Sequence, residues 1–84
     1  MIYELRILKS AVQQLGQLPP KDYQAVKSKI LSLSKNPRPV GYIKLKGRPA
    51  YRIRQGNYRI IYEIFDEFLL IRIIRIGHRK DVYK

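Results

Sequence analysis

The 84-residue sequence contains no cysteine and only six acidic residues. Without cysteine, neither a disulfide framework nor a thiolate metal site can stabilise the fold. The short length excludes multidomain enzymes, nucleotide-binding dehydrogenase folds and barrel hydrolases, which all need longer chains. We therefore expect a single domain over residues 1–84 that depends on a small hydrophobic core.

Long hydrophobic runs are also absent. No stretch approaches the roughly 18 consecutive apolar residues of a membrane-spanning helix, and residues 1–6 lack the basic-then-apolar order of a signal peptide. The single histidine and the lack of a glycine-rich phosphate loop leave no metal cluster or nucleotide motif. These features predict a cytoplasmic protein with no membrane contact, no metal and no cofactor.

The scarcity of acidic residues leaves a large positive charge. Eighteen lysine and arginine residues give a formal net charge of +12. Residues 38–84 hold 12 basic and 4 acidic residues, whereas residues 1–37 hold 6 and 2. Because 45% of the residues are hydrophobic, the chain is not a disordered basic tail. The charge favours a polyanionic partner, nucleic acid first, with an acidic protein or anionic lipid as competitors.

Hydrophobic spacing predicts a strand, two helices and then a run of strands. Residues 2–7 alternate as in a strand, residues 8–18 and 22–33 carry helical stripes, and Ser10 and Asp22 are candidate helix caps. Later strands are expected over residues 43–45, 51–54, 58–65 and 68–76, followed by a loop over residues 77–80. This order predicts an α+β fold in which a two-helix hairpin packs on one face of an antiparallel or mixed sheet, leaving the other face open.

The densest basic segment, residues 44–59, contains six basic residues and no acidic residue. Arg52 and Arg54 are two positions apart, so they project from the same face of a strand. If the turn at residues 55–57 pairs the neighbouring strands, Arg59 joins them, and three guanidinium groups form a multidentate phosphate clamp. The alternative is a solvated basic face with no specific ligand. A membrane-binding surface fits less well, because the arginines lie on strands and not on an amphipathic helix.

Residues 77–83 form a second candidate site, because they gather the single histidine, His78, with Arg79, Lys80 and Tyr83. Metal-independent RNA cleavage needs a base for the 2′-hydroxyl proton, cations for the phosphate and a donor for the leaving oxygen. A histidine or a tyrosine can take the first role, and an arginine can stabilise the phosphate. The alternative is an exposed, inert His78 and a Tyr83 ring that packs on the sheet edge.

Six short segments together resemble the RelE/ParE toxins of bacterial and archaeal toxin–antitoxin systems, and the RelE branch in particular. They are residues 18–19, 36–39, 44–47, 51–54, 56–63 and 77–83. The resemblance implies a microbial-RNase-like fold with two N-terminal helices against a four- or five-stranded, mainly antiparallel sheet. It also implies an endoribonuclease that cleaves mRNA in the ribosomal A site. In RelE proteins the 2′-hydroxyl attacks the adjacent phosphate and leaves a 2′,3′-cyclic phosphate and a 5′-hydroxyl.

The same resemblance implies roles for individual residues. Arg52, Arg54, Arg59 and Arg79 fall on positions that bind the scissile phosphate, and Tyr83 falls on the C-terminal tyrosine. The best-known RelE proteins have lysine at positions 52 and 54, and arginine does not change its protonation state in practice. Arg52 and Arg54 are therefore expected to act as phosphate clamps, with Tyr83 or, alternatively, the histidine as the base.

Further expectations concern partners. We expect Lys44, Lys46, Arg48 and Lys80 to bind the ribosomal RNA backbone. The resemblance implies a cognate acidic antitoxin, RelB-like or of another family, that forms a hetero-oligomer with a toxin that is otherwise a monomer. One alternative is a ParE-like inhibitor of DNA gyrase, a class that shares the fold and generally lacks the catalytic arginines and tyrosine. Another is a non-toxic relative that only binds nucleic acid or antitoxin.

Overall fold

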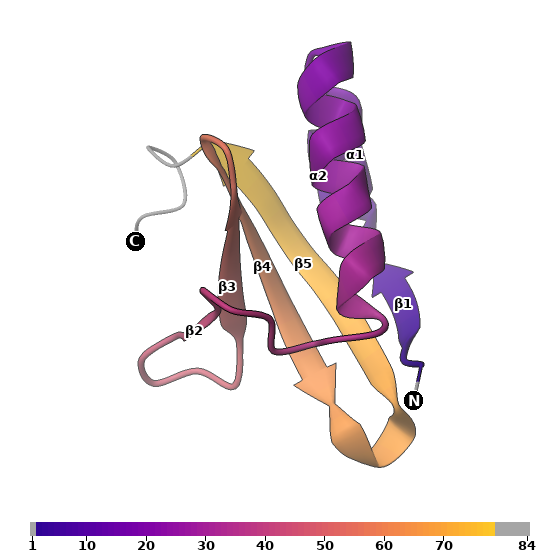
Figure 1. Cartoon of the computed structure of the whole chain (residues 1–84), viewed down its shortest axis with the longest axis vertical. Helices are drawn as coiled ribbons and strands as arrows, with labels where there is room; N and C mark the ends of the chain where they lie inside the picture. Colours follow the sequence, from indigo (N-terminus) through magenta and orange to yellow (C-terminus); the bar gives the residue numbers. More distant parts are fainter. Residues whose placement is uncertain (1, 79–84) are drawn as a thin grey trace.

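The structure, a computed structural model, describes residues 2–78. Two helices run antiparallel on one side of a sheet (Figure 1). The elements are, in chain order, β1 (Glu4–Ile7), α1 (Lys9–Gly16), α2 (Pro20–Leu33), β2 (Ile43–Lys44), β3 (Tyr51–Gln55), β4 (Tyr58–Phe65), the 3-10 turn η1 (Asp66–Phe68) and β5 (Leu70–His78). The predicted α+β class and the order of helices and strands are confirmed.

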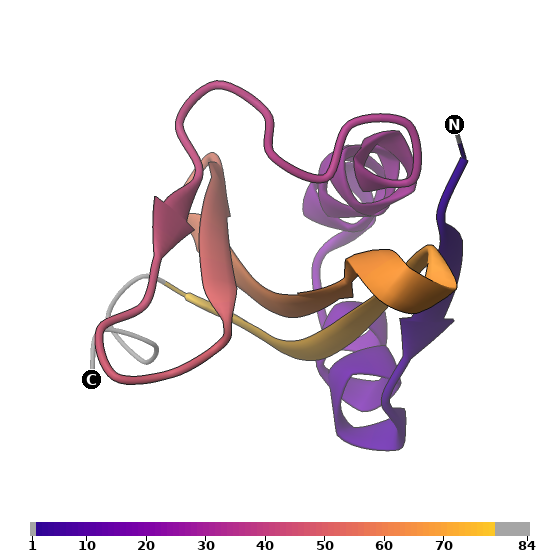
Figure 2. The same ribbon diagram turned by 90° about the horizontal axis from the view of Figure 1, so that it is seen from below.

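The five strands are arranged in the order β1-β5-β4-β3-β2. β1 pairs with β5 in parallel, and every other neighbouring pair is antiparallel. The parallel pair arises because the chain leaves β1 through the helical hairpin before it returns to the sheet, and parallel strands need such a crossover. Seen from below, β2 and β3 lie at the far side of the sheet from β1 (Figure 2). The expected mainly antiparallel sheet is confirmed.

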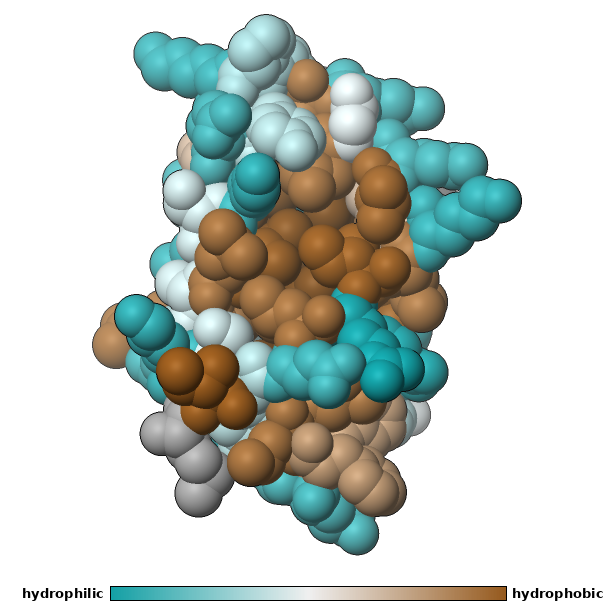
Figure 3. All heavy atoms as spheres, turned by 90° about the vertical axis from the view of Figure 1, so that its right-hand side faces the viewer, coloured by the Kyte–Doolittle hydropathy of each residue, from teal (hydrophilic) through white to brown (hydrophobic). Residues whose placement is uncertain are grey.

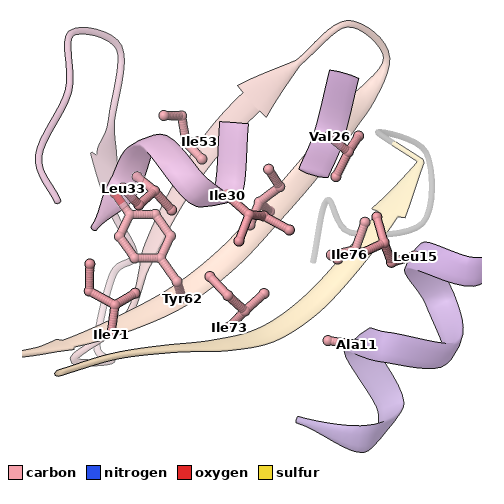
Figure 4. Close-up of a cluster of buried hydrophobic side chains, with 11 residues drawn as sticks. Ala11, Leu15, Val26, Ile30, Leu33, Ile53, Tyr62, Ile71, Ile73 and Ile76 are labelled. Carbon is pink, nitrogen blue, oxygen red and sulfur yellow. The ribbon is translucent and has the colours of Figure 1, made fainter. Parts of the chain in front are cut away.

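The core lies between the two helices and one face of the sheet (Figure 4). Helical spacing brings buried side chains of both helices onto alternate residues of β3, β4 and β5, as the sequence pattern predicts. Each fully buried aliphatic side chain contributes about 1.5–3 kcal/mol. The cluster is Ala11, Leu15, Val26, Ile30, Leu33, Ile53, Ile60, Tyr62, Ile71, Ile73 and Ile76.

Two polar contacts tie the loop after α2 to the sheet. The Tyr62 hydroxyl donates to the carbonyl of Pro37 at 2.7 Å, and burial raises the pKa of Tyr62 to about 12. The carboxylate of Asp66 accepts hydrogen bonds from the Arg38 guanidinium at 2.9 Å and from the Tyr3 hydroxyl at 2.6 Å. Asp66 thus joins the N-terminal strand, the loop and the turn between β4 and β5.

Both helices begin before the residues expected to cap them. The residue that precedes α1 is Leu8 and the one that precedes α2 is Pro19, and neither caps its helix with a side chain. The prediction of Ser10 and Asp22 as caps is therefore wrong, since both lie inside the helices. A proline at the first helical position already has the helical φ angle, so Pro20 starts α2 without a polar cap.

The ends of the strands also differ from the prediction. β1 begins at Glu4. β5 begins at Leu70, because η1 and the left-handed Leu69 (φ 47°) form the turn that precedes this strand. β5 continues to His78, so the prediction of a loop is wrong for residues 77 and 78, and its remaining residues lie outside the described part of the chain. The first half of the predicted loop is therefore part of the sheet.

Apolar side chains gather in the middle of the surface on the side of the helices and β1 (Figure 3). Leu8, Val12 and Leu31 are among the large hydrophobic residues exposed on or beside the helices. Exposed apolar patches of this kind mark surfaces for association. Over residues 2–78, neither helix is long and apolar enough to cross a membrane.

Candidate nucleic-acid interface

The sheet face turned away from the helices carries two rows of arginines. In the first row, Arg54 of β3 lies opposite Arg59 of β4, which lies opposite Gly77 of β5. The pairing of β3 and β4 through the turn at residues 55–57 is thus as predicted, and it places Arg59 on the face that carries the β3 arginines. In the second row, Arg52 and Arg75 flank Ile61. We call Arg52, Arg54, Arg59 and Arg75 the arginine face.

Arg75 was not among the residues singled out from the sequence, and a β-bulge explains why. The register shifts between Ile61 and Tyr62, which pair with Arg75 and Ile73, so Ile74 is an extra residue on β5. Strict alternation would place Arg75 on the same face as Ile73, which is fully buried in the core. The bulge turns Arg75 to the open face, where its side chain is exposed. No glycine or proline at position 73, 74 or 75 signals this irregularity.

The four arginines differ in burial. Arg54 and Arg75 are exposed and Arg52 is half-buried, whereas Arg59 is only 5% exposed. A buried guanidinium interacts more strongly with an anion than an exposed one, because less water screens the charge. Ile61, which is 6% exposed, lies between Arg52 and Arg75 in the second row and is apolar. The face therefore combines a desolvated charge with three more accessible ones.

The two carboxylates on the described strands each form an ion pair with an arginine outside the arginine face. Glu63, on β4, is ion-paired with Arg72 at 2.7 Å, and Glu4, on β1, is ion-paired with Arg6 at 2.9 Å. The first pair joins the central strand β4 to β5, and the second lies on the edge strand β1.

His78 ends β5 directly opposite Tyr58, and the two rings meet edge to face at 5.8 Å. Alternation places His78 on the helix side of the sheet, one residue beyond Gly77, which faces Arg59. The Tyr58 hydroxyl donates to the Asp22 carboxylate at 3.0 Å, and this hydrogen bond raises the pKa of Tyr58. Tyr58 is therefore neutral at physiological pH.

The remaining candidate residues lie apart from the arginine face or beyond the described chain. Lys44, Lys46 and Arg48 are exposed on β2 and the loop after it, and Lys44 Nζ donates to the carbonyl of Arg48 at 3.4 Å. Lys44 pairs with Tyr51, which projects to the core side of the sheet. Three further candidates lie outside the described residues: Arg79, Lys80 and Tyr83. Within residues 2–78, no three acidic or histidine side chains come together as metal ligands would.

Comparisons with known proteins agree on one superfamily. A family model described as "ParE toxin of type II toxin-antitoxin system" matches residues 5–83. Toxin RelG of Mycobacterium tuberculosis is 34% identical over 86 residues, which cover 100% of this chain and 99% of that protein. The mRNA interferase toxin RelE of Escherichia coli is 29% identical over 83 residues, which cover 95% of this chain and 86% of that protein.

Solved structures give the same result. The archaeal RelE–RelB complex from Pyrococcus horikoshii matches with a TM-score of 0.85 and 31% identity, covering 98% of this chain and 100% of that one. The isolated Escherichia coli RelE toxin matches with a TM-score of 0.79 and 28% identity, covering 96% and 90%. The chain therefore belongs to the RelE/ParE superfamily and is a RelE-like toxin of a type II toxin–antitoxin system.

Proposed function

We propose that this toxin is a ribosome-dependent endoribonuclease that cleaves mRNA in the A site and so inhibits translation. The 2′-hydroxyl of the message attacks the adjacent phosphate, giving a 2′,3′-cyclic phosphate and a 5′-hydroxyl. The observation that carries this proposal is the arginine face, in which four guanidinium groups from three neighbouring strands share one surface. Such a surface is suited to a phosphate that gains negative charge during the reaction.

The arginines stabilise the phosphate and do not transfer protons. Because arginine stays protonated at every physiological pH, its contribution is charge and directed hydrogen bonds. Arg59 is the best placed for the transition state, since it is almost fully buried and its charge is the least screened. Arg52, Arg54 and the bulge residue Arg75 hold the flanking backbone, and Arg79 adds a further positive charge.

We assign the role of general base, which accepts the proton of the 2′-hydroxyl, to Tyr83. His78 is the alternative base. Tyr58 is unsuited to the role, because the hydrogen bond to Asp22 raises its pKa and engages its only proton. His78 is one residue from the row of Arg59 and rests against the Tyr58 ring. Because its side chain lies on the helix side of the sheet, it could reach the reaction only around the end of β5, and it is therefore the second choice as base.

Two macromolecular partners follow from the same surfaces. Lys44, Lys46, Arg48 and Lys80 would bind the ribosomal RNA backbone through salt-dependent contacts. Because the archaeal relative was solved in complex with RelB, we assign this chain an acidic antitoxin that neutralises the basic surface in a hetero-oligomer. Its binding should weaken with salt, but less where apolar surface is buried. Because ribosomes are cytoplasmic, the proposed activity implies that the toxin acts in the cytoplasm.

A second candidate function is inhibition of DNA gyrase, favoured by the ParE name of the matching family. This function needs no chemistry from the toxin and would leave the message intact. The arginine face and the mRNA interferase names of curated relatives favour cleavage. A third possibility, a relative that has lost toxicity, predicts harmless expression without antitoxin.

The test is induction of the chain in cells without antitoxin, followed by primer extension on translated messages. The wild type should produce cuts within A-site codons, and Arg59→Ala with Tyr83→Phe should abolish them. Arg6→Ala is the matched control, because Arg6 lies on the same sheet but is paired with Glu4 far from Arg59. Intact message would overturn the proposal, and trapped DNA–gyrase breaks in the same cells would support the second function.

A further inference from the structure

A pocket of about 360 Å³ lies at the C-terminal end of β5, beside the arginine face. β1 pairs with β5 only as far as Ile73, so the last part of β5 has no strand neighbour on that side. The C-terminal end of α1 takes that place. The Gln14 side-chain oxygen accepts a hydrogen bond from the backbone N–H of Ile76 at 2.7 Å, where a strand partner would otherwise bind.

The pocket presents two glutamine amides from the C-terminal end of α1. Gln14 lies in the last turn of α1, Gln17 is the C-cap residue three positions on and keeps a helical conformation, and both line the pocket. The side-chain oxygen of Gln14 accepts the hydrogen bond from Ile76 N–H. The NH₂ group of the same amide therefore points away from Ile76 and carries two hydrogen-bond donors. Gln17 is exposed and adds both donor and acceptor capacity.

The other walls of the pocket are aromatic and apolar. The Tyr58 and His78 rings form one side, and Leu18 and Ile76 contribute aliphatic surface. A volume of 360 Å³ is at the lower end of the range for small-molecule sites. A flat aromatic ring with a polar edge fits this combination, since unpaired bases of RNA bind by stacking on aromatic side chains and by hydrogen bonds to their edges.

The pocket lies on the helix side of the sheet and meets the arginine face at the free edge of β5. Arg75 belongs to both, and Gly77, which lines the pocket, is the residue opposite Arg59 and adds no side chain between the two sites. A nucleotide whose base occupies the pocket would therefore extend its phosphate past Gly77, around the edge of β5, toward Arg75. We propose that this pocket binds the base of a nucleotide next to the scissile phosphate, and that Gln14 and Gln17 determine which base is preferred. This inference rests on the proposed function for its RNA substrate.

Binding is tested on the ¹⁵N-labelled full chain by NMR titration with the four nucleoside 5′-monophosphates and with ribose 5-phosphate as a base-free control. The side-chain amide signals of Gln14 and Gln17 and the backbone signal of Gly77 should shift with the nucleotides and not with ribose 5-phosphate. Equal shifts with ribose 5-phosphate would show a phosphate site only and overturn the proposal. Unchanged glutamine signals with all five compounds would also overturn it.

Base preference is tested by mapping cleavage codon by codon with Gln17→Ala and Gln14→Glu. The second change keeps an oxygen for the N–H of Ile76 but removes the two amide donors. Each should change the relative cleavage of favoured and disfavoured codons about fivefold to tenfold. Gln13→Ala is the matched control, because Gln13 is exposed on the same helix and does not line the pocket.

Three other outcomes are decisive. Unchanged codon distributions in both variants would overturn the proposal. Weaker antitoxin binding with an unchanged distribution would identify the pocket as a docking site for an extended peptide on the β5 edge, which also overturns it. If the wild type cleaves no message, the proposed function fails and the nucleotide titration alone decides whether the pocket binds a base.

Discussion

Arg54 lies directly opposite Arg59 in the antiparallel pair formed by β3 and β4. Like charges at facing positions destabilise a sheet, and Arg59 is in addition almost fully buried. Nothing in the packing of the core requires this arrangement, since both side chains project from the face away from the helices. The proposed role of these arginines in RNA binding would explain why the sheet keeps this pair despite its cost in folding free energy.

Arg54→Gln should stabilise the free toxin. Removing one of the two facing charges raises the free energy of unfolding by about 0.5 kcal/mol at low ionic strength. The gain should shrink at high salt, because salt screens the repulsion. Urea unfolding at two salt concentrations measures both effects. A variant that is less stable than the wild type at low salt would contradict the repulsion that we describe.

Arg75→Ala should weaken RNA binding and reduce its salt dependence. If Arg75 contacts one phosphate, the slope of log affinity against log salt falls by about 0.7 for a single strand. The probe is a 2′-O-methyl RNA oligonucleotide, which cannot be cleaved. Arg6→Ala is again the control, since Arg6 is paired with Glu4 near the other edge of the sheet. An identical slope for Arg75→Ala and the wild type would show that Arg75 does not contact a phosphate and would contradict its role in RNA binding.

Tyr58→Phe should lower stability but preserve cleavage. The change removes the hydrogen bond to Asp22 and leaves the ring that packs against His78. Since the hydroxyl has no assigned part in proton transfer, the single-turnover rate on ribosomes should stay within about threefold of the wild type. A loss of about a hundredfold, which is typical of a missing general acid or base, would instead make Tyr58 a proton carrier.

Asp66→Asn should reduce stability at neutral pH and have no effect in acid. The hydrogen bonds from Arg38 and Tyr3 hold the pKa of Asp66 below its ordinary value. The stabilisation is therefore complete above the unfolded pKa of about 3.9 and is lost as the pH falls through the lower folded pKa. Thermal unfolding from pH 7 to pH 2 should show the two curves converging. A constant difference across this range would contradict the assignment.

Much of the fold can be predicted from local patterns. Alternation in the segments that became β3 and β4, helical spacing in α1 and α2, and the turn at residues 55–57 place the core on one face and three arginines on the other. These features are set by neighbouring residues, so a single sequence is enough to find them.

The remaining features depend on contacts between distant segments. The bulge that exposes Arg75 is a property of the β4–β5 pair, and the parallel pairing of β1 depends on where the helical hairpin returns the chain. The pocket likewise depends on Gln14, whose side chain binds the backbone of Ile76 in place of a strand partner. Ile76 lies 62 positions away in the sequence. Aspartate is a residue type that often caps helices, which is why Asp22 is predicted as a cap. The helix instead begins at Pro20, two residues before it.

The most direct test of the account is the rate of mRNA cleavage on purified ribosomes with an empty A site, compared for the wild type, Arg59→Lys and Arg59→Ala. If Arg59 stabilises the charged transition state, Arg59→Ala should slow single-turnover cleavage by about 100- to 1,000-fold. Arg59→Lys should lie between, because lysine keeps the charge but not the planar fork. Thermal unfolding of each variant shows that the fold is retained. Equal cleavage rates for Arg59→Ala and the wild type would contradict the central claim that the arginine face performs the reaction.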